Sequence, residues 1–171
     1  MSTTIRSTPI GPLTLTASDE GITRVAFGAA PADTAPSTEA GQWLEQACRE
    51  LDEYFAGTRT AFTVPVDLRG VGAGQRAALD LLGAVGHGET TTYGRLAAQL
   101  ARRGGPGSES WSSDVGPRRV GSAMARNPVP VLVPCHRVVG SNGDLTGYAG
   151  GLEIKRRLLE LESPQGMLGS A

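Results

Sequence analysis

The spacing of apolar residues changes along this 171-residue chain, and the change restricts the folds that the chain can adopt. Near the N-terminus, two short apolar segments flank a Ser-Asp-Glu-Gly turn, and they contain Ile10, Leu13, Leu15, Ile22, Val25 and Phe27. This pattern predicts a β-hairpin. Residues 39–55 and most segments after residue 75 instead have apolar residues at helical spacing. The sequence therefore predicts an α+β protein with a small antiparallel sheet in its N-terminal part and a helical C-terminal part.

Local signals divide the chain further. Phe62, Val64 and Val66 alternate with polar residues or proline and predict a third strand. The glycine-bearing segment 67–74 follows, and we interpret it as the boundary between two subdomains. We therefore expect an N-terminal α/β subdomain at residues 1–70 and a C-terminal domain at residues 71–163. The polar tail, residues 164–171, is expected to be disordered.

The second part has the pattern of several short helices. Helical spacing, capping residues and breakers predict helices over residues 75–85, 93–101, 114–126 and 153–162, and a buried strand over residues 129–133. Thr90 to Thr92 offer an N-cap for the second of these helices. A glycine- and serine-rich loop, residues 102–113, separates the second helix from the third, and arginines follow the start of the third. This arrangement is a weak signal for a DNA-binding helix-turn-helix.

Charge is distributed unevenly. Residues 1–85 hold 6 Arg against 10 acidic residues, whereas residues 86–160 hold 10 basic against 6 acidic residues, for net charges of −4 and +4. This asymmetry favours a polyanionic partner for the second part, although a balanced exposed surface explains the same counts. With two cysteines, no signal-peptide pattern and no apolar run of about 20 residues, we expect a cytoplasmic protein with reduced thiols and no membrane role.

Cys135 is the candidate nucleophile. It ends an apolar run and precedes His136 and Arg137, whose charges are expected to favour the thiolate. Neighbouring residues on an extended backbone point to opposite faces, so a proton relay from Cys135 to His136 needs a sharp turn or a bridging water, and we favour the water. The alternative is a buried cysteine that acts only as a small apolar residue.

Glu162 is the candidate third member of this group. Ile154, Leu158 and Leu161 form the predicted inward stripe of the last helix, and Glu162 lies four residues after Leu158 on the same side. A carboxylate facing a core needs a partner, and His136 is a candidate. The alternative places Glu162 in solvent on a frayed helix end.

Several separate segments match one family in order. They are Pro9 to Leu15, Leu51 to Gly57, Gly88 to Leu96, Arg119-Val120-Gly121, Asn127 to Pro130, Pro134 to Val138, Gly147 to Gly151 and Lys155 to Glu162. Together they closely resemble the O6-alkylguanine-DNA alkyltransferases over almost the whole chain. The pentapeptide Pro-Cys-His-Arg-Val in this setting is the most specific part of the resemblance.

The resemblance implies a repair protein that flips an O6-alkylguanine, or also an O4-alkylthymine, out of duplex DNA and moves its alkyl group irreversibly to its own cysteine. Cys135 is then the acceptor, His136 deprotonates it through a water, and Glu162 orients His136. Asn127 braces the active-site turn, and Tyr93 supports the leaving guanine at N3. From residue type alone, Tyr93 is equally a core tyrosine.

The resemblance also assigns a DNA surface and a substrate pocket. Arg118 matches the arginine finger that fills the base stack after nucleotide flipping. The third helix is expected to enter the minor groove, where small residues permit close approach, although such a face is more often a helix-packing surface. The DNA-binding residues implied are Thr92, Arg118, Arg119, Gly121, Ser122 and Ala125. The pocket residues implied are Met124, Val138, Tyr148 and Ala149, and backbone groups of Cys135 and Val138 are expected to read the guanine edge.

The sequence departs from the family at two places. Ala73 and Leu79 stand where the family usually has a Phe and a Trp, so the core beneath the site must pack differently. The loop at residues 102–113 is longer than usual, and its Arg102, Arg103 and Trp111 either extend the DNA contact or, as we favour for Trp111, pack the loop down.

Cofactors and competing functions complete the expectations. Some family members bind zinc in the N-terminal part, but Cys48 and the distant His87 do not form a tetrahedral site, so neither a metal nor another cofactor is expected. We expect a monomer that acts on double-stranded DNA. The alternatives are a non-reacting sensor of alkylguanine, which Cys135 argues against, and a thiol hydrolase using Cys135, His136 and Glu162.

Overall fold

The computed structural model describes residues 1–32, 38–104, 111 and 116–164. The chain clusters into two compact units, of which the first comprises residues 1–69, 128–132 and 160 onward, and the second comprises residues 70–127 and 133–159. The expected division near residue 70 treated the two parts as consecutive segments, whereas the chain re-enters the first unit twice. The expected tail beyond residue 164, the centre of the loop at 102–113 and the predicted helix start at Asp114 lie outside the described residues.

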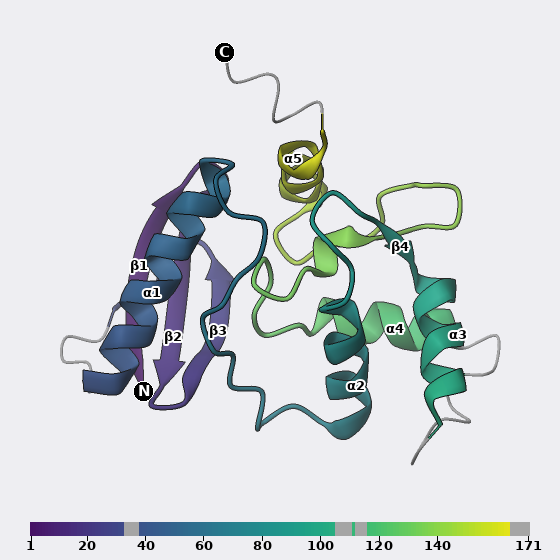
Figure 1. Cartoon of the computed structure of the whole chain (residues 1–171), viewed down its shortest axis with the longest axis horizontal. Coiled ribbons are helices and arrows are strands. Elements are labelled where there is room, and N and C mark those ends of the chain that lie inside the picture. The colour runs from purple at the N-terminus through teal and green to yellow at the C-terminus, as the bar shows by residue number, and fades with distance from the viewer. Residues whose placement is uncertain (33–37, 105–110, 112–115, 165–171) are drawn as a thin grey trace. The chain divides into compact units, whose positions relative to one another are not determined.

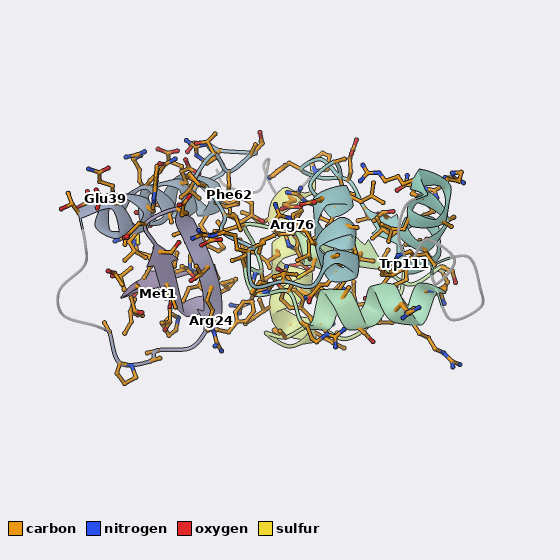
Figure 2. All side chains as sticks on the ribbon, turned by 90° about the horizontal axis from the view of Figure 1, so that it is seen from below. Met1, Arg24, Glu39, Phe62, Arg76 and Trp111 are labelled. Carbon is orange, nitrogen blue, oxygen red and sulfur yellow. The ribbon has the colours of Figure 1, made fainter. Side chains whose placement is uncertain are left out.

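The first unit contains a three-stranded antiparallel sheet in the order β1-β2-β3 and one long helix (Figure 1). The strands are β1 (Ser2–Thr8), β2 (Gly11–Ser18) and β3 (Gly21–Phe27), and the helix is α1 (Thr38–Phe55). The predicted hairpin is confirmed as β2 and β3, while β1 escaped detection because its Ser and Thr residues give no apolar alternation. Leu13, Leu15 and Leu51 are fully buried, whereas Arg24 and Glu39 are exposed (Figure 2).

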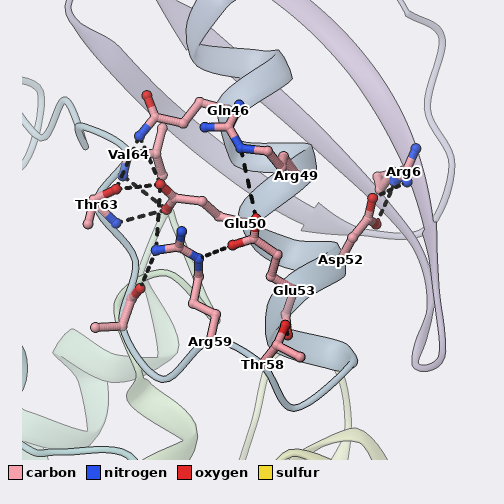
Figure 3. A network of polar contacts seen from close by, with 11 residues as sticks. Arg6, Gln46, Arg49, Glu50, Asp52, Glu53, Thr58, Arg59, Thr63 and Val64 are labelled. Atoms are coloured by element: carbon pink, nitrogen blue, oxygen red, sulfur yellow. Dashed lines mark hydrogen bonds and ion pairs between the residues drawn. The ribbon is translucent and has the colours of Figure 1, made fainter.

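The predicted strand over residues 62–66 is wrong. Only Val66 pairs with a strand, through a single parallel bridge to Ile22. The backbone N–H groups of Thr63 and Val64 donate instead to the buried Glu50 carboxylate of α1, at 2.8 and 3.1 Å (Figure 3). Pro65 lacks an N–H, so the segment is held to the unit through a side chain and its carbonyls rather than a ladder.

The second unit is mostly helical. It contains α2 (Ala73–Leu82), β4 (Thr91–Thr92), α3 (Tyr93–Arg103), α4 (Gly116–Ala125), the 3₁₀ turn η2 (Cys135–Arg137), β5 (Val138–Val139) and the first eight residues of α5 (Leu152–Glu162). The predicted N-cap of α3 is confirmed, because the Thr92 hydroxyl accepts a hydrogen bond from the Arg95 N–H. β4 and β5 pair in parallel, which places the start of α3 beside the segment that follows Cys135.

The predicted buried strand over residues 129–133 is also wrong. These residues are mostly buried but form turns and isolated bridges, and Val131 adopts a φ of 74°. That conformation is strained for a β-branched residue and incompatible with a strand. The chain therefore turns sharply between Asn127 and Cys135.

The buried side of α5 differs from the expected stripe. Lys155, Leu158 and Glu162 are buried at 2% exposure or less, whereas Ile154 and Leu161 are half-buried. Leu158 and Glu162 thus lie on the expected side, and the alternative that placed Glu162 in solvent is excluded. Across the described ranges, no helix is long and apolar enough to cross a membrane.

Candidate active site

A pocket of about 560 Å³ opens in the second unit, where α3, α4 and residues 146–149 meet Cys135. It is lined by Tyr93, Pro117, Arg118, Gly121, Met124, Ala125, Cys135, Thr146, Gly147, Tyr148 and Ala149. Eight of the residues expected at the site from the sequence are in this set. The structure does not place Thr92, Arg119, Ser122, Asn127, His136, Val138 or Glu162 on the pocket wall.

Hydrogen bonds across the active-site turn position Cys135. The Asn127 side-chain amide donates to the Val133 carbonyl at 2.9 Å, and the Cys135 N–H donates to the same carbonyl at 2.8 Å. Asn127 also forms a hydrogen bond with the Cys135 thiol. The Asn127 side chain thus holds the backbone just before the cysteine and touches the reacting sulfur.

Burial keeps the thiol protonated. Cys135 is 4% exposed, and loss of solvation raises the pKa of its thiol to about 11, although the hydrogen bond from Asn127 and the positive charge of Lys155 act in the opposite direction. The expectation that His136 and Arg137 favour the thiolate is therefore wrong. The guanidinium of Arg137 donates to the Val85 carbonyl at 2.6 Å. A reaction at this sulfur needs a base.

Lys155 is the cation near Cys135, and residue-by-residue reasoning missed it. It is the chain's single lysine, and it is fully buried. Its Nζ donates to the carbonyls of Val138 and Thr146, at 2.7 and 2.8 Å, and lies 5.9 Å from the centre of the Tyr93 ring. Burial lowers the pKa of Lys155, against the opposing influence of Cys135. Lys155 therefore ties the segment after the cysteine to the loop that lines the pocket.

Tyr93 forms another wall of the pocket. Its hydroxyl accepts a hydrogen bond of 3.0 Å from the Thr146 hydroxyl, and its ring faces Gly121, where an added Cβ would lie 3.9 Å from ring carbons. Tyr93 is half-buried rather than enclosed, so it is not simply a core tyrosine. Its hydroxyl is fixed at the pocket rim between α3 and the loop after β5.

His136 and Glu162 are both buried. His136 is fully buried on the same 3₁₀ turn as Cys135, so the backbone is not extended at this point. The relay through a water stays a prediction. In the first unit, the Tyr54 hydroxyl donates to Glu162 Oε1 at 2.7 Å. Tyr54 is 1% exposed, and the sequence did not single it out. The sequence signal for Tyr54 is a tyrosine at an inward position of a helix, because a buried hydroxyl needs a hydrogen-bond partner.

Several other predicted residues have different roles in the structure. The Thr92 hydroxyl caps α3, and the Val138 carbonyl accepts from Lys155 while its N–H donates to the Cys135 carbonyl. Gln75, which the sequence did not single out, donates to the Ala123 and Arg126 carbonyls at the end of α4, at 3.2 and 2.8 Å. It thereby satisfies carbonyls that a helix end leaves unpaired. In the part of the chain that the structure describes, no group of three His, Cys, Asp or Glu could hold a metal ion.

Comparison with known proteins agrees with this geometry. Residues 73–164 match the family described as 6-O-methylguanine DNA methyltransferase, DNA binding domain, and residues 1–68 match its ribonuclease-like domain. The chain is 39% identical over 161 residues to the methylated-DNA--protein-cysteine methyltransferase of Methanosarcina acetivorans, covering 92% of this chain and 96% of that protein. It is 41% identical over 157 residues to the protein of that name from Mycobacterium tuberculosis, covering 90% and 87%.

Solved structures give the same relationship. The crystal structure of Mycobacterium tuberculosis OGT in complex with DNA matches with a TM-score of 0.75 and 36% identity, over 95% of each chain. A crystal structure of Mycobacterium tuberculosis O6-methylguanine methyltransferase matches with a TM-score of 0.73 and 35% identity, over 95% of this chain and 93% of that one. With both family models, these relatives and this fold in agreement, the chain belongs to the 6-O-methylguanine DNA methyltransferase family.

Proposed function

We propose that this protein repairs DNA by moving the alkyl group of an O6-alkylguanine, or of an O4-alkylthymine, from duplex DNA to Cys135 in a single turnover. The observation that carries the proposal is a buried thiol that opens into a pocket lined by Arg118 and Tyr93. The pocket has room for a flipped base, and Arg118 stands exposed at its mouth, where it can fill the vacated stack. All lining residues come from the second unit. We propose that the protein acts as a monomer.

The chemistry requires proton removal before displacement. His136 takes the thiol proton through a water, the sulfur forms a bond to the alkyl carbon, and the bond between that carbon and O6 breaks. The electron pair goes to the guanine, which takes up a proton in turn. Tyr93 assists by donating a hydrogen bond to N3 of the leaving base. The product is a thioether on Cys135 and an unmodified guanine, so atoms and charges balance.

Glu162 has a supporting role in this proposal. Its carboxylate orients His136 and balances the positive charge that His136 gains, while the Tyr54 hydroxyl holds Oε1 of the same carboxylate. Because the thiol pKa lies near 11, little thiolate exists at neutral pH without this assistance. The high thiol pKa therefore supports a base relay in preference to a preformed thiolate.

Intact-protein mass spectrometry tests the proposal. Incubation with a duplex bearing one O6-methylguanine should add the mass of one methyl group to one protein molecule, with no further turnover. Cys135→Ser should bind the duplex and remain unmodified, because it retains the DNA-binding surface but not the thiol. Cys48→Ser is the matched control: this second cysteine lies on α1 of the first unit, so its loss should leave transfer intact.

Two outcomes would overturn the proposal. Binding of the modified duplex without any mass increase would indicate a sensor of alkylguanine. Repeated hydrolysis of an ester or peptide that depends on Cys135 and ignores the duplex would indicate a thiol hydrolase.

A further inference from the structure

A second pocket lies along α4, and no part of the proposed reaction uses it. It has a volume of about 280 Å³ and is lined by Gly74, Gln75, Trp111, Arg119, Ser122, Ala123 and Arg126. The carbonyl of Trp111 approaches the start of α4 so closely that a Cβ at Gly116 would lie 2.3 Å from it. The Trp111 ring lies near the first turn of α2, 3.7 Å from the position that a Cβ on Gly74 would take.

The two pockets lie on opposite flanks of α4. The larger pocket takes Arg118, Gly121 and Ala125 from this helix, whereas the smaller pocket takes Arg119 and Ser122 together with Arg126, which follows the helix. Successive residues of a helix are turned by about 100°, so the residues that line each pocket fall on one side of α4. The exposed line through Arg118 and Ser122, here called the crest, separates the two sides. A ligand seated on the crest therefore meets one pocket on each side.

The chemistry of the smaller pocket suits an anion. Arg119 and Arg126 line it, and among the described residues no carboxylate belongs to its lining. The two arginines are seven residues apart, or about 10 Å if the helical rise continued to Arg126, which is about three times the 3.4 Å axial rise per phosphate of one strand. Gln75 fixes the backbone beneath Arg126 by bonding its carbonyl, and the indole of Trp111 offers an apolar wall for a sugar.

Minor-groove geometry connects these facts. The groove is about 6 Å wide, whereas a helix with its side chains is about 10–12 Å across, so a helix pressed on it must contact both backbones with its two flanks. The strand that places its flipped nucleotide in the larger pocket runs along that flank. The complementary strand must then border the other flank.

We infer that the smaller pocket, with Trp111, Arg119 and Arg126, binds backbone phosphates of the strand opposite the damaged nucleotide. The inference rests on the proposed function and on the expectation, implied by the family resemblance, that α4 enters the minor groove. It extends both by assigning one flank of α4 to each strand. Contacts to backbone phosphates increase the affinity for DNA but do not discriminate between base sequences. The pocket thus gives Trp111, which belongs to the unusually long loop, a place in DNA binding.

The test uses double- and single-stranded DNA that carry the same O6-methylguanine. It measures how tightly each DNA binds and how fast the protein removes the methyl group from each. Arg126→Ala should weaken binding of the duplex roughly three- to tenfold at moderate salt and reduce the slope of log affinity against log salt by about 0.9, the value for one phosphate contact. Its transfer rate from the single strand should stay within about twofold of wild type, because the opposing strand is absent. Arg119→Ala should add to the loss on the duplex.

Neutral phosphate substitution identifies the strand directly. Methylphosphonates in the complementary strand should weaken binding to wild type and leave binding to Arg126→Ala nearly unchanged, whereas methylphosphonates in the damaged strand should weaken both. Arg156→Ala is the matched control, since it removes an exposed arginine of α5 that pairs with Glu153.

Two results would overturn the inference. One is a loss of binding and transfer by Arg126→Ala that is equal on single- and double-stranded DNA. The other is that methylphosphonates in the complementary strand weaken binding to Arg126→Ala as much as binding to wild type. Stabilisation of wild type against unfolding by inorganic phosphate, together with unchanged duplex binding by Arg126→Ala, would indicate a site for free anions only. That result would also contradict the inference. Absence of transfer by wild type from either DNA would instead refute the proposed function.

Discussion

Cys135 shows how packing reverses the effect of neighbouring charges. Its sequence neighbours His136 and Arg137 suggested an activated thiolate, yet Arg137 bonds the Val85 carbonyl and burial controls the thiol. A nucleophile with a raised pKa stays protonated and unreactive until a substrate and a base are in place. This property suits the proposed reaction, in which each protein molecule reacts once.

A pH profile of transfer from free O6-benzylguanine tests this view. The thiol pKa lies near 11, above its usual 9.0, so the thiolate fraction rises about tenfold per pH unit across pH 7–10. In His136→Ala, we expect a rate at neutral pH that is lower by about 10²-fold or more, and a log rate that climbs with a slope near one up to pH 10. Wild type should depend much less on pH. A plateau below pH 9 in the variant would contradict a raised thiol pKa.

Tyr54 gives a second prediction at this scale. Tyr54→Phe removes the buried hydrogen bond to Glu162, so the carboxylate loses a partner and the free energy of unfolding should fall by about 1–3 kcal/mol. If Glu162 orients His136, transfer should also slow, and Glu162→Gln should slow it in the same direction. Urea unfolding and single-turnover rates measure the two effects.

Tyr93→Phe is the comparison, because its hydroxyl bonds to exposed Thr146. It should slow transfer while changing stability by less than Tyr54→Phe does. Full activity and full stability of Tyr54→Phe would show that this hydroxyl contributes nothing.

At the scale of elements, α4 depends on a close approach at its first residue. A Cβ on Gly116 would lie 2.3 Å from the Trp111 carbonyl oxygen and 3.1 Å from the Cβ of Ala97. Gly116→Ala should therefore move the residue 111 backbone or the start of α4, and destabilise the protein by about 1–3 kcal/mol. Thermal unfolding measures the loss.

Gly94→Ala in α3 is the matched control. No atom lies within 4 Å of its Cβ position, so the same added methyl should stabilise the helix by up to about 1 kcal/mol. A similar melting temperature for both variants would show that the contact at Gly116 relaxes without cost.

The errors in assigning elements share one cause. Glycine, capping and periodic signals correctly located α1, α3, α5 and the hairpin of β2 and β3, because those signals act within a few residues. Residues 62–66 and 129–133 have strand-like composition, but the Glu50 carboxylate takes the N–H groups of the first and a strained turn at Val131 occupies the second. Composition does not reveal which distant group will satisfy a backbone N–H.

At the scale of the whole molecule, the proposed function predicts that DNA binding and alkyl transfer can be separated by mutation. Arg118→Ala should impair transfer from duplex DNA far more than transfer from free O6-benzylguanine, because the free base has no base stack to leave. Single-turnover rates with both substrates measure the ratio. Equal slowing on both substrates would assign Arg118 to the shape of the pocket, which it also lines.

The sequence by itself determined the order of elements and the positions of the residues that carry the resemblance. The family is evident from motifs that are local, and the matches at residues 1–68 and 73–164 confirm it. Eight of the expected site residues meet at one pocket. One of the elements that carry them, α3, begins at the N-cap Thr92, which the local sequence predicted.

Only the tertiary structure decided the electrostatics of the site. It buried the single lysine against the carbonyls of Val138 and Thr146, placed the Tyr54 hydroxyl on Glu162 and raised the pKa of Cys135. It also separated the arginines of α4 onto two flanks with a pocket on each. The physical reason is that ionisation and hydrogen bonding depend on which groups exclude water from one another, and in a folded chain those groups are distant in sequence.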